Sequence, residues 1–247
     1  MGSEMCIRDR PLSIPRREET VMLATWHGTP LKRLVFDMDD VHSANPRYKD
    51  IVFKQTRAWD YLLSDNPFST ERFQSCFRFE KEKILEYGYP ANDPMYAPDR
   101  EEQAAKIKEK LGIPKDKKVI LYAPTFRGHV ATASSPDRID FERFCRELGN
   151  EYVIVCKHHP FVKNPPIIPE ELQHFARDLT KYLSIEDLLC CADICISDYS
   201  SLVFEYSLFE KPMIFYAYDY DNYCDWRGFY YDCLLYTSDA ADDRISV

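Results

Sequence analysis

The segment KVILYAPTFRG, residues 118–128, decides the fold class of this chain. Its first half contains the apolar run Val119–Ala123, which predicts a short strand buried on both faces. Its second half turns polar and ends on Arg127 and Gly128. Ligands of parallel sheets bind beyond the carboxyl ends of the strands, so this junction is a candidate site.

The same alternation of strand and helix signals recurs on both sides of this segment. Further strands are predicted at Val21–Thr25, Trp59–Leu63, Tyr152–Cys156, Asp193–Ser197 and Pro212–Tyr216. Helices are predicted at Glu71–Phe77, Glu80–Tyr87, Phe141–Leu148, Ile185–Cys191 and Ser200–Phe209, and between Asp99 and Gly112. Short strands that alternate with helices are typical of a parallel sheet covered on both faces, so we expect an α/β fold.

Helix caps support several of these boundaries. Ser69 or Thr70 is predicted to cap the helix that follows it, and Asp99 the helix that ends near Gly112. Ser184 and Asp187 have the spacing of a capping box.

Composition limits the class of protein. The 247 residues are 45% hydrophobic and 30% charged, as in a globular chain. The net charge of −9 argues against an extended electrostatic interface with nucleic acid. The 9 cysteines include no C-x-x-C pair, so we interpret them as reduced, buried thiols and predict no metal site. No apolar run reaches the ~18 residues that a membrane span needs.

The two ends of the chain differ from the rest. Met1–Arg10 lacks any periodicity, and Cys233–Val247 changes from apolar to small and acidic. We expect residues 1–20 and 233–247 to lie outside the fold, and the chain to be a fragment of a longer protein.

Polar residues follow the predicted strands. Ser200 and Ser201 supply hydroxyls where a helix is predicted to begin, and free N–H groups and the helix dipole favour an anion there. A serine that only caps the helix is the alternative. Arg127 can fork onto a phosphate, or it can be an ordinary surface arginine.

Three histidines also follow predicted strands. His158 and His159 are adjacent, and neighbouring side chains of an extended segment point to opposite sides, so at most one is expected to face a site. His27 precedes Gly28, which permits a sharp turn or a close approach to a ligand. A structural role and a catalytic role both remain open for each histidine.

Five motifs, in this order, resemble the CDP-glycerol glycerophosphotransferase family, whose enzymes prime and polymerise teichoic acids. They are TWHGTPLK (25–32), GYPAND (88–93), APTFR (123–127), KHHP (157–160) and ISDYSS (196–201), the last with Lys211-Pro212. The resemblance spans Trp26 to Asp232. Ala91 stands where the family usually has arginine, which leaves that arginine's contacts open.

The resemblance implies a GT-B-like architecture. Residues 21–95 would be the trailing part of an acceptor-side domain, and residues 96–232 a nearly complete Rossmann-type domain that binds the nucleotide donor. His27 and His159 match the catalytic histidines. The expected donor site contains Arg127, Ser200, Ser201, Asp198 and Thr125, with Gly28, Thr29 and Lys157 in support.

The implied reaction moves glycerol phosphate, or a related polyol phosphate, from CDP-glycerol or CDP-ribitol to a teichoic acid polymer or its lipid-linked primer. CMP leaves, and no cofactor is expected. We expect His27 to be the general base, with a rate that rises with pH through ~6.5, and His159 to act on the phosphate, although the two roles can be exchanged. The alternatives are a GT-B glycosyltransferase or epimerase that uses a UDP-sugar, and a truncated module that binds nucleotide without turnover.

The acceptor of such a reaction lies at a membrane. The expected location is therefore the cytoplasm, at the inner face of the membrane. Basic residues in the first part of the chain can meet a phosphate polymer or anionic headgroups, or can simply be solvated; they are Lys32, Arg33, Arg47, Lys49, Lys54 and Arg57.

Overall fold

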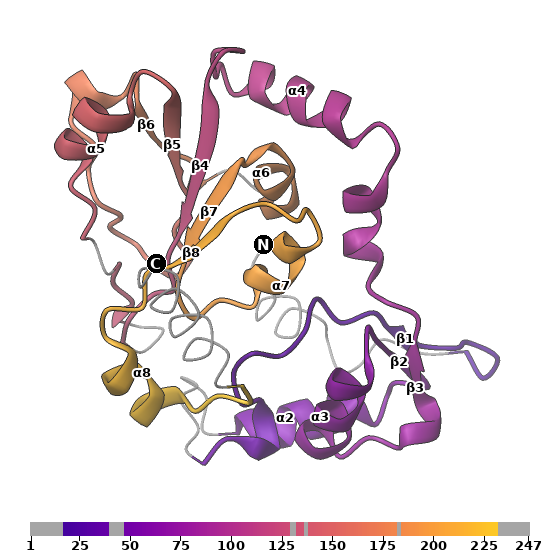
Figure 1. The fold of residues 1–247 in the computed structure, drawn as a ribbon. Helices are drawn as coiled ribbons and strands as arrows, with labels where there is room; N and C mark the ends of the chain where they lie inside the picture. Colours follow the sequence, from indigo (N-terminus) through magenta and orange to yellow (C-terminus); the bar gives the residue numbers. More distant parts are fainter. Residues whose placement is uncertain (1–16, 40–46, 129–131, 136–137, 182–183, 232–247) are drawn as a thin grey trace, which may run out of the picture.

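The computed structural model describes residues 17–39, 47–128, 132–135, 138–181 and 184–231. Two parallel sheets organise the chain (Figure 1). The first sheet joins β1 (Leu23–Ala24), β2 (Tyr61–Ser64) and β3 (Ile84–Glu86) in that order. The second has the order β6-β5-β4-β7-β8, with β4 at Lys118–Ala123, β5 at Tyr152–Cys156, β6 at Ala176–Asp178, β7 at Ile194–Ser197 and β8 at Met213–Phe215. The predicted α/β fold with parallel strands is confirmed.

Helices connect the strands of both sheets. They are α2 (Tyr48–Thr56), α3 (Pro67–Phe77), α4 (Arg100–Lys110), α5 (Phe141–Leu148), α6 (Ile185–Cys191), α7 (Leu202–Ser207) and α8 (Tyr220–Arg227). Short 3₁₀ helices cover Val35–Asp37, Lys81–Lys83, Pro90–Tyr96 and Glu170–Leu172.

Most boundaries in the second half of the chain agree with the sequence. Helix α5 has the predicted bounds and its C-cap is Gly149. Ser184 caps α6, and its hydroxyl accepts a hydrogen bond from the backbone N–H of Asp187 at 3.0 Å. Asp99 is the N-cap of α4. Strand β6 was not predicted; it is a three-residue strand at the edge of the sheet.

Three local predictions were wrong. Residues 80–87 are a 3₁₀ turn followed by β3, because Ile84 and Leu85 pair with β2 in a parallel ladder that overrides their helical pattern. Helix α3 begins earlier than expected, since Asn66 accepts from the N–H of Ser69 and Pro67 occupies the first turn. Helix α7 covers only Leu202–Ser207, with Ser201 as its N-cap.

The core of the second sheet reflects the alternation of side chains along β4. Val119 and Leu121 lie in one buried cluster, and Ile120 and Tyr122 lie in another on the opposite face. The first sheet has its own core, built around Leu62 and the aromatic residues of α3. Each sheet is therefore covered by its own set of helices.

The register of the second sheet brings the strand ends to one edge. Tyr122 of β4 pairs with Cys156 of β5, and Ala123 pairs with Ser197 of β7. Ser197 in turn pairs with Phe215 of β8. Because the strands are parallel and end together, the segments that follow β4, β5, β7 and β8 all leave from the same edge of the sheet.

Residues 228–231, called here the return segment, follow α8 and bond to the segment around Leu31 and Arg33 in the first half of the chain. The carbonyl of Gly228 accepts from the N–H of Arg33 at 3.2 Å, and the N–H of Tyr230 donates to the carbonyl of Leu31 at 3.0 Å. In Figure 1 the chain accordingly runs from the second sheet through α8 toward α2 and α3. The part of the chain beyond the second sheet thus packs against the first half.

Candidate functional site

His27 follows β1 and lies next to a residue with unusual backbone geometry. Trp26 has a φ of 51°, which turns its indole into the core against Phe73 and Phe77, at ring centroid distances of 5.7 and 4.8 Å. The His27 ring packs on that indole at 4.1 Å, and the residue is exposed to solvent. Neighbouring protein atoms remove part of the water around the ring. This desolvation disfavours the imidazolium and lowers the pKa of His27 from 6.5 to about 4.

Gly28 and Thr29 fix the turn after His27. Gly28 has a φ of +148°, a backbone conformation that favours glycine, and a Cβ at this position would lie 2.2 Å from Oε1 of Glu205 and would displace that carboxyl. Thr29 is buried, and its hydroxyl donates to Asp65 at 2.5 Å. Asp65 also accepts hydrogen bonds from Ser69 at 2.6 Å and from the Tyr89 hydroxyl at 3.0 Å.

His158 and His159 point in opposite directions. His158 is 3% exposed, and its Nδ1 lies 3.1 Å from the hydroxyl of Thr180. His159 is partly exposed and packs between Phe126 and Phe161, at ring distances of 4.9 and 4.5 Å. Of the pair, His159 is thus the one that solvent and a ligand can reach.

The tautomer of His159 follows from its contact with the backbone. The N–H of Phe161 donates to Nδ1 of His159 at 3.2 Å. Nδ1 is therefore an acceptor, and the neutral ring carries its proton on Nε2. Nε2 can then donate a hydrogen bond to an anion such as a phosphate oxygen.

Lys157 is directed away from the end of β4. Its ammonium donates to the carbonyl of Thr180 at 3.0 Å, beside β6. Burial lowers its pKa, and the charges of Asp178 and Glu186 partly compensate. Its contacts are therefore with the β6 side of the sheet.

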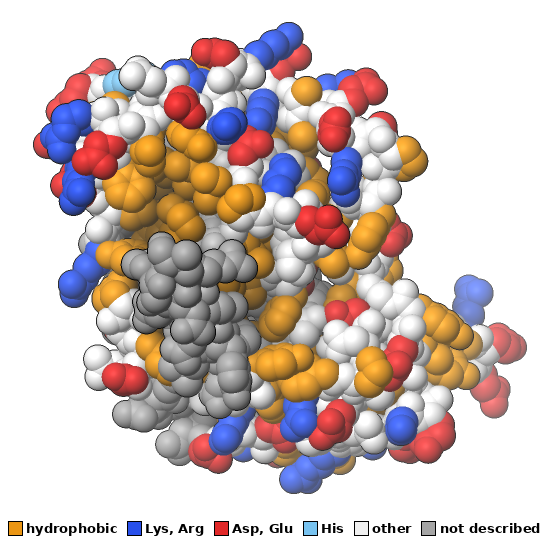
Figure 2. All heavy atoms as spheres, in the orientation of Figure 1, with side chains coloured by type: hydrophobic (Ala, Val, Ile, Leu, Met, Phe, Trp, Pro, Cys, Tyr) orange, Lys and Arg blue, Asp and Glu red, His pale blue; other side chains and the backbone are white. Residues whose placement is uncertain are grey.

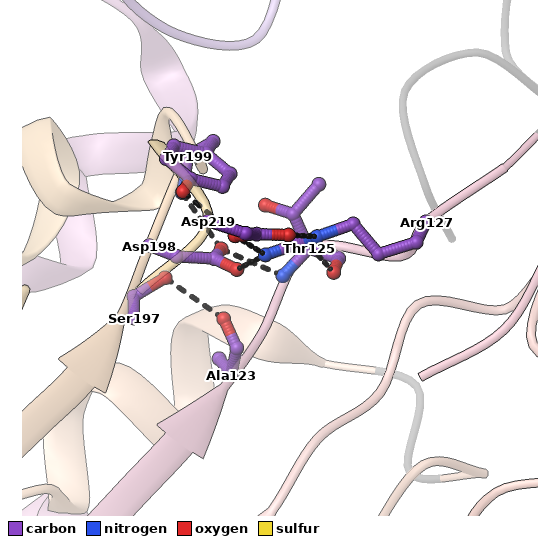
Figure 3. A network of polar contacts seen from close by, with 7 residues as sticks. All are labelled: Ala123, Thr125, Arg127, Ser197, Asp198, Tyr199 and Asp219. Atoms are coloured by element: carbon purple, nitrogen blue, oxygen red, sulfur yellow. Dashed lines mark hydrogen bonds and ion pairs between the residues drawn. The ribbon is translucent and has the colours of Figure 1, made fainter. Parts of the chain in front are cut away.

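Arg127 is the centre of a network that joins three strand ends (Figure 3). Its Nε and Nη2 donate to the two carboxyl oxygens of Asp219 at 2.8 and 2.9 Å, and Nη2 also donates to Asp198 at 2.9 Å. Nη1 donates to the carbonyl of Thr125. Desolvation lowers the pKa of Arg127, but hydrogen bonds to Asp219 and the charge of Asp198 outweigh it and raise the value overall.

The network leaves Arg127 little capacity for a ligand. Two carboxyl groups surround one guanidinium, and four of its five N–H donors are used by these contacts. Asp198 is 2% exposed, and its other oxygen accepts the backbone N–H groups of Thr125 and Tyr199 at 2.8 and 2.7 Å. Arg127 is therefore neither a solvated surface arginine nor an open phosphate fork in this state.

Thr125 and the two serines supply hydroxyls at this edge. Thr125 is 8% exposed, and its Oγ1 is buried without a hydrogen-bonding partner in the described part of the chain. Ser200 and Ser201 are partly exposed at the start of α7, where the Ser200 hydroxyl accepts from the N–H of Leu202 at 3.4 Å. An unsatisfied buried hydroxyl indicates a missing polar partner, such as a ligand oxygen.

Two carboxyl residues of this region were not predicted from the sequence. Asp219 follows β8, and it accepts a hydrogen bond from the Tyr199 hydroxyl at 2.8 Å as well as from Arg127. Glu205 lies on α7, four residues after a candidate serine, and only the required glycine at position 28 signals something close by.

The remaining predictions concern the ends, the thiols and the charge distribution. Residues 1–16 and 232–247 lie outside the described residues, so the predicted end segments stay predictions. Among the described cysteines, burial raises the pKa of Cys191 and Cys195 to about 12, as in unreactive core thiols. Within the described ranges, no helix is long and apolar enough to cross a membrane, and no cluster of three metal-binding side chains is found.

Comparison with known proteins places the chain in a family. The family model described as CDP-Glycerol:Poly(glycerophosphate) glycerophosphotransferase matches residues 2–241. A teichoic acid poly(glycerol phosphate) polymerase of Bacillus spizizenii is 42% identical over 230 residues, which are 90% of this chain and 58% of that protein. A teichoic acid poly(ribitol-phosphate) polymerase of the same organism is 43% identical over 185 residues, 72% of this chain and 29% of that protein.

A solved structure agrees with these relatives. A variant of the wall teichoic acid polymerase TagF, soaked with CDPG, superposes with a TM-score of 0.80 at 38% identity. The match covers 90% of this chain and 56% of that one. This chain thus spans between about a third and three fifths of the length of these three relatives. With a family model that covers nearly all of its residues, the chain belongs to the CDP-glycerol:poly(glycerophosphate) glycerophosphotransferase family.

Proposed function

We propose that this chain carries the donor site and the two reactive histidines of a transferase that moves glycerol phosphate from CDP-glycerol to a teichoic acid chain. The acceptor hydroxyl oxygen attacks the phosphorus next to glycerol. The bond between that phosphorus and the bridging oxygen of the diphosphate breaks, and CMP leaves. The relatives described above support this reaction, since they include polymerases of glycerol phosphate and of ribitol phosphate.

One observation about the fold carries the proposal. The aligned ends of β4, β5 and β7 bring Thr125, His159 and Ser200 to one edge of the second sheet. The unsatisfied hydroxyl of Thr125 supports a ligand at this edge. The contact of Gly28 with Glu205 of α7 supports a location of His27 beside the same edge, across from the donor.

The two histidines suit different tasks in this reaction. His27 is neutral at physiological pH, as a general base must be before it accepts the proton of the acceptor hydroxyl. His159 has its proton on Nε2 and can stabilise charge on the transferred phosphate. We therefore propose His27 as the base and His159 as the group on the phosphate side.

Arg127 has an indirect role in this proposal. Its guanidinium holds Asp198, whose second oxygen fixes the backbone of Thr125 and of Tyr199 at the start of the α7 turn. We propose that Arg127 and Asp198 shape the donor site, while Thr125, Ser200, Ser201 and nearby backbone N–H groups contact the diphosphate. Because α7 has only six residues, its dipole adds little, and the hydroxyls matter more.

The decisive experiment offers several donors to the chain together with a lipid-linked glycerol phosphate primer. CDP-glycerol and CDP-ribitol are compared with UDP-N-acetylglucosamine, and CMP, UDP and polymer are scored. Release of CMP and growth of the primer with a CDP-polyol support the proposal. UDP release, or calorimetric binding of CDP-glycerol without turnover, would favour the glycosyltransferase or the binding module instead.

We also propose that the acceptor is reached at an anionic membrane surface. Helix α2 and its flanks carry Arg47, Lys49, Lys54 and Arg57, and Phe53 between them is 38% exposed. Several basic residues of the first half have protein partners: Arg33 pairs with Asp39 at 2.8 Å, and Lys49 donates to a carbonyl. On the face seen in Figure 2, acidic and basic side chains are interspersed, so any such contact is local. Co-sedimentation with anionic but not with neutral vesicles tests it.

A further inference from the structure

Glu205 joins the two halves of the molecule at the His27 turn. It lies on α7 of the second half, yet its carboxyl group rests on Gly28 of the first half, where a Cβ would approach Oε1 to 2.2 Å and Cδ to 3.3 Å. With the carboxyl in this position, a side chain at residue 28 would have to displace it. Since Gly28 directly follows His27, the position of the Glu205 carboxyl limits where the His27 turn can lie.

The surroundings of this carboxyl are acidic. The titratable groups that face it are Asp65 after β2, Glu186 of α6 and Tyr89, which comes just before a 3₁₀ helix. Asp65 is held in place by three hydroxyl donors, on Thr29, Ser69 and Tyr89. Among the described residues, no lysine or arginine forms an ion pair with Glu205. A negative charge on Glu205 would have carboxylates as its nearest charged neighbours.

We propose that Glu205 is a positioning residue for His27, and that its carboxyl group, in the neutral acid form, is the surface on which the His27–Gly28 turn rests. Ionisation would draw water to the carboxylate and repel it from Asp65, which separates it from the turn. The role in positioning rests on the proposed function of His27 as base, whereas the neutral state of the carboxyl does not.

The titration of Glu205 supports the geometry. Desolvation raises its pKa from 4.5 to about 8; the hydrogen bond from its own backbone N–H opposes this shift, and the charges of Asp65 and Glu186 add to it. Between these two values the folded state binds one more proton at this site than the unfolded state does. The contribution of Glu205 to stability is therefore present below pH 4.5 and is lost as the pH rises through about 8.

The first experiment tests the neutral state without any assay of activity. Thermal unfolding of the chain is followed from pH 5 to pH 9 for the unchanged protein, for Glu205→Gln and for the control Glu210→Gln, whose residue is exposed just beyond the same helix. Glu205→Gln should match the unchanged protein at pH 5 and unfold several degrees higher at pH 9. The control should follow the unchanged protein throughout. Equal pH dependence of all three proteins would show that Glu205 is ionised and would overturn the proposal.

A second measurement covers a variant that fails to fold. Carbon NMR of the carboxyl groups in the unchanged chain should find Glu205 still protonated at pH 7, and an ionised signal there contradicts the proposal.

A third set of measurements tests the positioning role. Glu205→Ala should shift the imidazole carbon signals of His27, and Glu210→Gln should not. If CMP release is measurable, Glu205→Ala should lower kcat at least tenfold with KM for CDP-glycerol within twofold, and Glu205→Gln should restore kcat at pH 7. The positioning role is refuted if the His27 signals of Glu205→Ala do not shift. It is also refuted if the unchanged protein is active and Glu205→Ala has the same kcat. If the unchanged protein releases no CMP, the proposed function is refuted, but the unfolding and NMR tests of the neutral Glu205 carboxyl still hold.

Discussion

At the scale of single residues, His27 and His159 acquire their chemical states from different causes. Neighbouring protein atoms desolvate the His27 ring, which lowers its pKa and favours the neutral form. His159 is set by a single backbone N–H, which occupies Nδ1 and leaves the proton on Nε2. Neither cause is visible in the motifs HGT and HHP themselves.

The state of His27 changes the expected pH dependence. With its pKa lowered to about 4, His27 is already in its base form well below pH 6. CMP release should therefore show no rise attributable to His27 between pH 6 and pH 8, and should fall only as the pH approaches 4. The measurement is the pH profile of kcat over KM for CDP-glycerol. A rise centred near the ordinary value of ~6.5 would mean that the ring is solvated in the working enzyme.

Substitution separates the roles of the histidines. His27→Ala should reduce transfer by about 10²–10⁴-fold, the usual contribution of a general base, with donor affinity nearly unchanged. His159→Ala should reduce turnover and also weaken donor binding, because it loses the Nε2 donor. Steady-state kinetics and calorimetry with CDP-glycerol give the two quantities. Wild-type turnover in a folded His27→Ala protein contradicts the mechanism.

The serines before α7 provide a matched test of the donor site. Replacing Ser200 and Ser201 together by Ala should weaken CDP-glycerol binding moderately, because two hydroxyls are lost and backbone N–H groups remain. Ser207→Ala is the control, since this exposed serine lies on the same helix and its hydroxyl donates to the carbonyl of Phe204. Calorimetric affinities decide the matter: equal values for the double variant and the control would place the diphosphate elsewhere.

At the scale of elements, Arg127 connects the segments that follow β4, β7 and β8. Asp198 comes after β7 and Asp219 after β8, and both bind the guanidinium that extends from the segment after β4. Tyr199 stacks on Tyr223 of α8 at 4.0 Å and donates to Asp219, so the same network also anchors α8. The network therefore fixes the segments that follow β4, β7 and β8, which form the proposed donor site.

Loss of Arg127 should destabilise the fold strongly. Arg127→Ala leaves the buried Asp198 carboxylate without its cation, and breaking one side of a buried pair costs about 3–5 kcal/mol. The control is Arg143→Ala, whose pair with Glu147 is more than half exposed, so its loss should leave the free energy of unfolding nearly unchanged. Urea unfolding at pH 7 measures both free energies. Similar small losses in the two variants would show that solvent screens the Arg127 network.

At the scale of the whole molecule, the return segment holds the first half against α8. Tyr230 makes three of these contacts: its hydroxyl donates to Asp37 and accepts from the N–H of Leu34, and its backbone N–H donates to the carbonyl of Leu31. Burial and the charges near it raise the pKa of Tyr230, so it stays an intact donor. Phe68 of α3 packs against the adjoining Tyr231 in a tilted arrangement, with ring centroids 4.2 Å apart.

Two truncations distinguish the return segment from the predicted foreign tail. Removal of Cys233–Val247 should leave the thermal midpoint nearly unchanged, because that segment lacks periodicity. Removal of residues 228–247 should lower the midpoint clearly, since it also deletes the backbone bonds to Leu31 and Arg33. Differential scanning calorimetry compares the two. A large drop with the shorter truncation would show that the tail packs into the fold.

The sequence by itself determined the parallel α/β architecture and the position of nearly every buried strand, because strands such as Val119–Ala123 are apolar throughout and bounded by turns. It also determined which strand ends carry polar side chains. Tertiary structure decided the rest. Residues 84–86 became a strand because β2 offered a partner, and Arg127 became a bridge because Asp219 and Asp198 converge on it from distant segments. The lowered pKa of His27 depends on desolvation by neighbouring protein atoms, and the contact of Glu205 with Gly28 depends on proximity across the two halves. Both are properties of the folded chain and of no local pattern.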